Sequence, residues 1–343
     1  MDFKSETFIN TFQIRGFMGI EELVKEAETI KKASGVDAAV EFYTAKLVGM
    51  IESDNDRAGI LNQRGFLYRI KKEYETALKD YYKALGYSWQ DELSAEIQIN
   101  MADSLRLQTK FDEAHLRVDR AILKTLNFLI SAKAHRQKGL IYVKQEKFED
   151  ALNQYELAKV IIDSQISLEL VLEGFVENEA SILKVKAEVL EPLGSLYVDY
   201  MKDASKAQEA YALFKESLDI SLKLDNEQNI VNAVRGLGKV AMMTGKPEEA
   251  IPHYETAWDI LQKTQYGRSI TTTALLLGEA HLANNEPEKA RPYLERFVAD
   301  VQKLKQPDAD NDHRKPHFEN IQKYIPNSGL TIDKFDEVVK MFS

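Results

Sequence analysis

The stretch that decides the fold reads GLIYVKQEKFEDALNQYELA over residues 139–158. It opens with a small residue, and an aromatic residue follows three positions later. An alanine comes twelve positions after the small residue, an aromatic residue four positions after the alanine, and a second small residue three positions after that. Two apolar stretches of helical period flank a short polar turn, which predicts a helix–turn–helix unit. The motif residues are Gly139, Tyr142, Ala151, Tyr155 and Ala158.

The same frame recurs along the chain. The opening small residues stand at positions 27, 65, 102, 139, 194, 238 and 278, in steps of 38, 37, 37, 55, 44 and 40 residues. Repeats of this size bury their apolar faces only by stacking on neighbours, so the pattern predicts an all-α solenoid of about seven units. Besides the copy quoted above, the copies are Gly65-Tyr68-Ala77-Tyr81-Ala84, Ala102-Leu105-Ala114-Val118-Ala121, Gly238-Ala241-Ala250-Tyr254-Ala257, Gly278-His281-Ala290-Leu294-Phe297 and a weaker Ala27-Ile30-Ala39-Tyr43-Lys46.

Glycines mark the first helix of five units. A glycine in a helix interior costs about 1 kcal/mol relative to alanine, so its recurrence in one frame position implies a close helix crossing. We expect the alanine of the second helix, such as Ala77, to face the glycine. We expect the aromatic residue that follows, such as Tyr81 or Tyr155, to fill the space between one unit and the next.

The unit that opens at Gly194 leaves two alternatives for its second helix. Ala210, Phe214 and Ser217 fit the frame if four residues are inserted, most simply as an extra helical turn. Ala207, Tyr211 and Phe214 fit it if one residue is inserted. The sequence pattern does not choose between them.

The frame resembles the tetratricopeptide repeat (TPR) family over roughly residues 20 to 300. The steps exceed the usual TPR period of about 34 residues, which indicates longer helices or longer loops. The resemblance implies a right-handed superhelix whose concave groove is lined by first helices and binds proteins or peptides. The residues that carry it are Leu193-Gly194-Tyr197, Leu237-Gly238 with Ala250, Tyr254 and Ala257, and Gly139-Tyr142-Phe148-Ala151-Tyr155-Ala158.

Three segments depart from the regular frame. Residues 1–19 are predicted to form an N-terminal extension to the solenoid of residues 20–304. The apolar insertion near residues 160–192 either extends the neighbouring helices or forms an arm that docks a partner or makes homo-oligomers. Residues 305–343 are predicted to form a polar linker followed by capping helices around Phe318–Tyr324 and Ile332–Phe342, because a solenoid needs a terminal cap.

Several function classes are disfavoured by composition. The chain has no cysteine, which excludes disulfides, thiolate metal sites and a cysteine nucleophile. A net charge of −10 argues against a general nucleic-acid binder. No apolar stretch approaches the roughly 18 residues of a membrane span, and residues 1–19 hold no apolar signal-peptide core. Because phosphate loops, nucleophile elbows and metal-binding motifs are also missing, we expect a cytoplasmic, non-catalytic protein without cofactor or metal.

The candidate binding residues are polar side chains at the groove-facing positions of first helices. In the first half of the chain they include a basic cluster. This cluster is interpreted either as a clamp for carboxylates of an acidic peptide, or as a solvated helix face paired with acids such as Glu96 and Asp103. The candidates are Asn62, Arg69, Asn100, Arg106, Lys133, Arg136, Lys144, Asn232, Arg235 and Lys239.

One known groove chemistry fits only in part. TPR co-chaperones use a carboxylate clamp of Lys, Asn, Asn, Lys and Arg, and the resemblance implies the two matching roles for Asn100 and Lys133. Asn62, Phe66 and Gln137 stand where the clamp has Lys, Asn and Arg. These departures put binding of a chaperone tail in doubt.

The leading hypothesis is therefore an interaction scaffold that binds a peptide or protein segment in its groove. Two alternatives remain. One is a peptide-sensing regulator like the TPR quorum-sensing receptors, although residues 1–19 are too short for a helix-turn-helix. The other is a structural subunit of a larger assembly.

Overall fold

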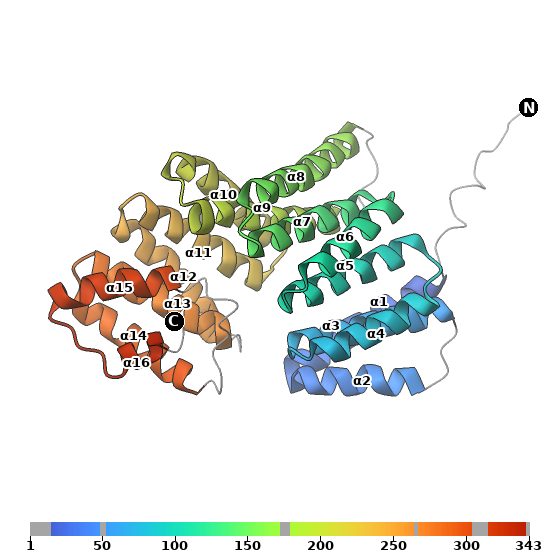
Figure 1. Cartoon of the computed structure of the whole chain (residues 1–343), viewed down its shortest axis with the longest axis horizontal. Coiled ribbons are helices and arrows are strands. Elements are labelled where there is room, and N and C mark those ends of the chain that lie inside the picture. The colour runs from blue at the N-terminus through green and yellow to red at the C-terminus, as the bar shows by residue number, and fades with distance from the viewer. Residues whose placement is uncertain (1–14, 49–52, 172–178, 264–266, 304–314, 341–343) are drawn as a thin grey trace, which may run out of the picture. The chain divides into compact units, whose positions relative to one another are not determined.

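Helices and short turns make up the described part of the chain (Figure 1). The computed structural model describes residues 15–48, 53–171, 179–263, 267–303 and 315–340. The contacts divide the chain into two compact units, Met1–Leu168 and Glu169–Ser343. The all-α class predicted from the sequence is confirmed, and the described first and second helices form seven pairs. The predicted domain boundaries stay predictions.

The first unit stacks its helices in chain order, each packing on the next as far as α7, and they run from blue to green in Figure 1. The polar turns between the paired helices lie where the frame places them. The elements are α1 (Arg15–Ser34), α2 (Val36–Val48), α3 (Asp54–Ile70), α4 (Tyr74–Tyr87), α5 (Asp91–Leu107), α6 (Phe111–Lys124), α7 (Phe128–Lys144) and α8 (Phe148–Val171), whose last residues belong to the second unit.

The second unit continues the pairing and ends in two further helices. Buried Phe318 and Ile321 of α15 share an apolar cluster with Leu275 of α13, so α15 covers part of the apolar face of the last pair. The elements are α9 (Glu179–Ser195), a π-helical turn (Leu196–Met201), a 3-10 turn (Ala204–Lys206), α10 (Ala207–Lys223), α11 (Glu227–Met243), α12 (Pro247–Lys263), α13 (Gly267–Ala283), α14 (Pro287–Gln302), α15 (Lys315–Ser328) and α16 (Phe335–Lys340).

The frame glycines lie under large side chains of the paired helix. A Cβ atom added to Gly65 would stand 2.7 Å from Cε1 of Tyr81, and Tyr155, Tyr254 and Leu294 cover the other frame glycines of this kind in the same way. The expectation that the aromatic residue fills the space between repeats is incomplete, because Tyr81 also covers the glycine of its own pair. Tyr81 lies one helical turn after Ala77 on the same face, and its longer side chain reaches the glycine of its own pair.

The pair α9–α10 resolves the two alternatives for the unit at Gly194. Ala210, Phe214 and Ser217 are buried, whereas Tyr211 is 48% exposed. The Phe214 ring covers both Gly194 of its own pair and Gly236 of the next first helix, so this ring also lies between two successive repeats. The four inserted residues are accommodated by the π-helical and 3-10 turns that separate α9 from α10.

The turn inside most pairs uses a residue in the left-handed region. This residue always stands seven positions after the opening small residue, and only one of the five is a glycine. In the pair α3–α4 the N–H of Glu73 donates to the carbonyl of Tyr68 and the N–H of Lys72 donates to that of Arg69, which closes the end of α3. The five residues are Lys72, Thr109, Glu146, Gly245 and Asn285.

The 160–192 segment lengthens helices where it is described. Residues 160–171 continue α8, and α9 begins at Glu179, with Ile162 and Ile182 buried. Residues 172–178 lie outside the described part of the chain. Self-association through this segment stays a prediction.

We expect Gly65→Ala to destabilise the protein by about 2 kcal/mol, because overpacking against the fully buried Tyr81 ring outweighs the better helix propensity of alanine. Urea unfolding followed by circular dichroism measures the change. Gly86→Ala in α4 is the matched control, since nothing lies within 4 Å of the added Cβ atom. A stabilisation of both variants would contradict the close crossing.

We expect Thr109→Gly to stabilise the protein by about 1 kcal/mol, because a β-branched residue is strained at its φ of 59°. The same change at Asn285 should gain less, since asparagine tolerates this region. Thermal and urea unfolding of both variants compare the gains. Equal gains at the two positions would show that strain at Thr109 is not the cause.

Candidate functional site

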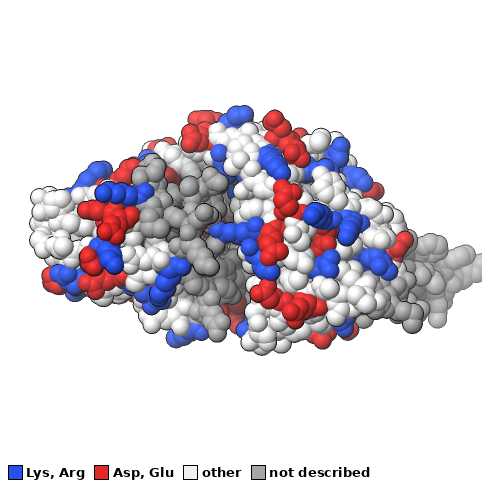
Figure 2. All heavy atoms as spheres, turned by 60° about the horizontal axis from the view of Figure 1, so that its bottom comes forward, with Lys and Arg blue, Asp and Glu red and all other residues white. Residues whose placement is uncertain are grey.

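The ten candidate residues lie on first helices, and all of them are buried or half-buried. Seven belong to the first unit and three to the second. On the face shown in Figure 2, cationic and anionic side chains alternate across the described surface. In the first unit the residues are Asn62 and Arg69 on α3, Asn100 and Arg106 on α5, and Lys133, Arg136 and Lys144 on α7; in the second they are Asn232, Arg235 and Lys239 on α11.

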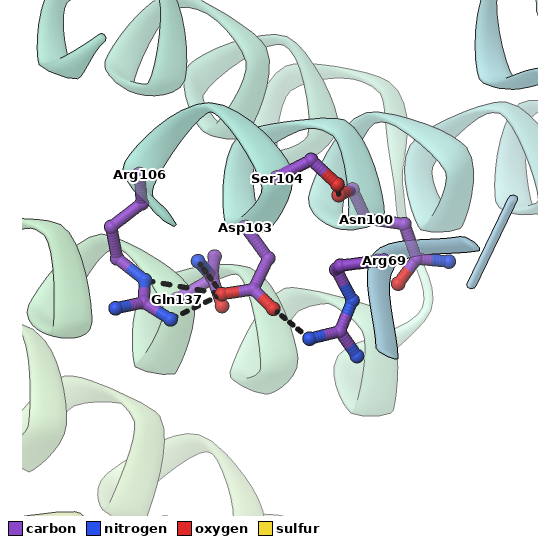
Figure 3. Close-up of polar contacts among 6 residues, drawn as sticks. All are labelled: Arg69, Asn100, Asp103, Ser104, Arg106 and Gln137. Atoms are coloured by element: carbon purple, nitrogen blue, oxygen red, sulfur yellow. Dashed lines mark hydrogen bonds and ion pairs between the residues drawn. The ribbon is translucent and has the colours of Figure 1, made fainter. Parts of the chain in front are cut away.

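Asp103 of α5 joins two of these arginines (Figure 3). Its Oδ2 lies 2.7 Å from Nη1 of Arg69 on α3. Its Oδ1 accepts hydrogen bonds from Nε and Nη2 of Arg106 at 3.1 and 2.6 Å, and from Nε2 of Gln137 on α7 at 3.1 Å. Three successive first helices are thus connected through one carboxylate.

The electrostatics of this cluster favour an ionised carboxylate. Burial by itself raises the pKa of Asp103, but the guanidinium groups of Arg106 and Arg69 and the hydrogen bonds from Arg106 and Gln137 hold that pKa well below its usual range. Burial also raises the pKa of Tyr81, and Asp103 raises it further, while Arg69 opposes the rise. The tyrosine that covers Gly65 therefore has its hydroxyl beside the charged cluster.

Two further contacts cross between first helices of this unit. Nδ2 of Asn100 donates to Oδ1 of Asn62 at 2.9 Å, and Nζ of Lys133 lies 3.3 Å from Oε1 of Glu96. Arg69 also stacks over the Phe66 ring, 4.7 Å from its centroid. The acids that the sequence offered as partners of the basic cluster do pair with it, Asp103 with both arginines and Glu96 with Lys133.

Sequence reasoning did not select Asp103 and Gln137 as site residues. Asp103 was recognised only as a pairing acid, and Gln137 only as a departure from a known clamp. Both residues can be located in the repeat frame. Asp103 stands one residue after Ala102, and Gln137 stands two residues before Gly139, the opening small residues of their repeats. What the frame did not show is that their side chains meet.

The second unit holds a smaller polar cluster. Lys239 pairs with Asp199 of the π-helical turn at 2.7 Å, and Nη2 of Arg235 donates to Oδ1 of Asn232 at 2.7 Å. Burial lowers the pKa of Arg235, and the negative charges of Glu191 and Asp199 oppose this shift. The ion pair of Lys239 joins α11 to the π-helical turn.

The described residues hold no group of three or more His, Cys, Asp or Glu side chains that would bind a metal ion. Among the described helices, none is both long and apolar enough to cross a membrane. The chemistry that the first-unit cluster offers is recognition, through guanidinium and amide N–H donors at a face where cations outnumber acids.

Several solved structures share this fold. A signal transduction ATPase with numerous domains that has a tetratricopeptide repeat sensor, from Pyrococcus horikoshii, gives a TM-score of 0.61 at 15% identity over 94% of this chain and 45% of that one. The apo quorum sensor NprR from B. thuringiensis gives 0.60 at 15% identity, covering 96% and 87%. A Rap protein complexed with competence and sporulation factor gives 0.58 at 12% identity, covering 95% and 91%.

These similarities confirm the TPR fold predicted from the repeat frame, and at such identities they show the fold alone. No family model matches the sequence, and no curated protein matches it significantly.

We expect Asp103→Asn to cost roughly 2 kcal/mol at pH 7, because it leaves two largely buried arginines without their shared carboxylate. Asp103 has a depressed pKa when folded, so its contribution is present above the unfolded value of about 3.9 and is lost as pH falls from there toward the folded value. The stability difference between the two proteins should therefore shrink below about pH 4.

Urea unfolding at pH 7 and pH 3 measures this difference. Asp119→Asn is the control, because Asp119 pairs with Lys138 while its side chain stays 47% exposed, and it should cost less than about 1 kcal/mol. A difference for Asp103→Asn that does not change with pH would contradict a stabilising ionised carboxylate.

Proposed function

We propose that the protein is a non-catalytic interaction scaffold that binds an acidic peptide or protein segment on the first-helix face of its first unit. The observation that carries the proposal is the charge balance at the groove-facing positions of α3, α5 and α7. Five cations stand there against two acids, Glu96 and Asp103. An incoming carboxylate would be attracted by the basic side chains that predominate at these positions. The five cations are Arg69, Arg106, Lys133, Arg136 and Lys144.

In this proposal Asp103 holds the guanidinium groups of Arg69 and Arg106 in place and still leaves some of their N–H donors available. Arg69 contacts Asp103 through Nη1, and Arg106 does so through Nε and Nη2. Each guanidinium has five N–H donors in a rigid plane, so both retain donors for a ligand carboxylate. Preorganised donors bind with a smaller loss of side-chain entropy than mobile ones.

The asparagines supply a second kind of contact. The pair Asn62–Asn100 uses one amide hydrogen and one carbonyl oxygen. Asn62 is buried, whereas Asn100 is half-buried and its remaining amide groups match the N–H and C=O groups of an extended peptide backbone. In the proposal the arginines and lysines select acidic side chains, while Asn100, oriented by Asn62, holds the backbone.

A peptide-sensing regulator is the second candidate. It is favoured by the similarity to the quorum sensor NprR and to a Rap protein in complex with competence and sporulation factor, over at least 95% of this chain. In such a protein the peptide would change the conformation of the chain, whereas a scaffold would bind without a large change. Hydrogen exchange with and without saturating peptide separates the two candidates.

We expect Lys133→Glu with Arg136→Glu to weaken binding of fluorescein-labelled hexaglutamate about tenfold or more, because two attractive charges become repulsive. Fluorescence anisotropy measures the affinity at low and physiological salt, and the wild-type affinity should fall as salt rises.

The matched control is Lys79→Glu with Lys147→Glu, two exposed cations on α4 and in the α7–α8 turn, which change the net charge equally. Equal loss in both double variants would show that only net charge matters. Wild-type protein that does not bind the peptide at low salt would refute the acidic-peptide proposal.

A further inference from the structure

Large apolar side chains are exposed at matching places in the first unit. They lie on second helices or in the turns that follow them, away from the first-helix face. Their exposed fractions run from 59% at Val160 to 101% at Leu126, although apolar residues of this size gain free energy from burial. We call these residues the outer strip: Val48, Trp89, Leu123, Leu126 and Val160.

The repeat frame places the outer strip in two rows. One row stands 21 positions after the opening small residue of each repeat and holds Val48, Leu123 and Val160. The other row stands 24 positions after that residue and holds Trp89 and Leu126. Stacking places equivalent positions of successive repeats next to one another, and one contact between second helices lies on the same side of the repeats. The guanidinium of Arg117 on α6 donates to the hydroxyl of Tyr82 on α4 at 2.9 Å.

The fold itself does not require apolar residues at these positions. In the second unit the equivalent positions of the last two pairs are also exposed, and they hold polar or small residues. The same architecture thus exists with and without the apolar rows. The equivalent residues in the second unit are Asp259, Gln262, Ala299 and Gln302. Exposed apolar patches of this kind are typical of interaction surfaces.

Two unpaired cations lie beside the middle of the outer strip. Lys83 on α4 and Arg120 on α6 occupy one frame position, both are exposed, and neither has an ion-pair partner within the described residues. Nearby acids already have partners: Asp91 pairs with Lys124, Asp119 with Lys138 and Asp163 with Lys159. Glu92 lies in the first turn of α5, where the helix N-terminus stabilises its charge.

This charge pattern argues against a symmetric dimer through the outer strip. A two-fold interface places the same patch on both sides, so Lys83 and Arg120 of one copy would face those of the other. Like charges in that position cost free energy. A partner whose apolar stripe is flanked by carboxylates has no such penalty and gains two ion pairs.

We propose that the outer strip is a second docking surface, which binds an amphipathic helix of a partner protein whose apolar stripe is flanked by Asp or Glu. Apolar residues spaced three and four apart on such a helix match the helix-in-groove mode of recognition. Trp89 is the anchor, because aromatic residues dominate the binding free energy of interfaces. The surface is independent of the first-helix face, so the chain has two binding surfaces of different chemistry.

Trp89 also provides the measurement. The chain has two tryptophans, and the other, Trp258, is half-buried against Tyr293. In a Trp258→Phe background, emission reports on Trp89 alone. The probe is a helical peptide of about 18 residues, five turns, with a leucine stripe flanked by glutamates. A second peptide has lysines in place of the glutamates.

We expect a saturable blue shift of Trp89 emission with the glutamate peptide, and binding about tenfold weaker with the lysine peptide. Leu123→Asp with Leu126→Asp should weaken binding of the glutamate peptide about tenfold or more, with helicity unchanged because both side chains are exposed. Leu222→Asp is the matched control, an exposed leucine of the second unit, and should leave the affinity unchanged.

Three results would overturn the proposal. The first is no shift with the glutamate peptide up to about 1 mM, the limit of weak specific binding. The second is equal binding of the two peptides, which would leave charge complementarity without a role. The third is a wild-type dimer in light scattering that the Leu123→Asp, Leu126→Asp variant converts to a monomer, which would make a second copy of the chain the occupant.

Discussion

The rest of this structure depends on the contact between a frame residue without a side chain and the large side chain that covers it. At Gly65 the Tyr81 ring occupies the space that a Cβ atom would need. Two helix backbones approach this closely only if one surface has no side chain at the crossing. The contact therefore fixes the spacing inside the five pairs that have such a glycine, and repetition of the spacing fixes the stacking of pairs.

Recognition chemistry in the first unit is a product of the same spacing. Successive first helices are stacked in a constant register. A side chain one turn after the opening small residue of one repeat therefore contacts a side chain near the opening small residue of the next repeat. Arg69 reaches Asp103 in this way, and Asp103 reaches Gln137. A polar ladder across three helices thus arises from a frame whose primary role is packing, and the charges differ between repeats because packing does not restrict them.

Most of the fold was predictable from the sequence, because packing positions must keep both size and spacing. The glycines, the alanines and the seven pairs all follow from one frame. The partners within the site were less predictable. Whether Arg106 turns toward Asp103 or toward a ligand depends on side-chain length and on nearby donors such as Gln137, which periodicity does not encode. The left-handed residue of each turn was also missed, because four of the five positions, including Thr109, hold no glycine.

Phe214 differs from the other covering side chains because its ring closes two crossings, at Gly194 and at Gly236. In a repeat array, cooperativity comes from the interfaces between neighbours. A ring shared by α9 and α11 concentrates that coupling in a single side chain, since neither helix separates from α10 without exposing it. We therefore expect α9, α10 and α11 to unfold together, although the irregular π-helical turn interrupts the array between α9 and α10.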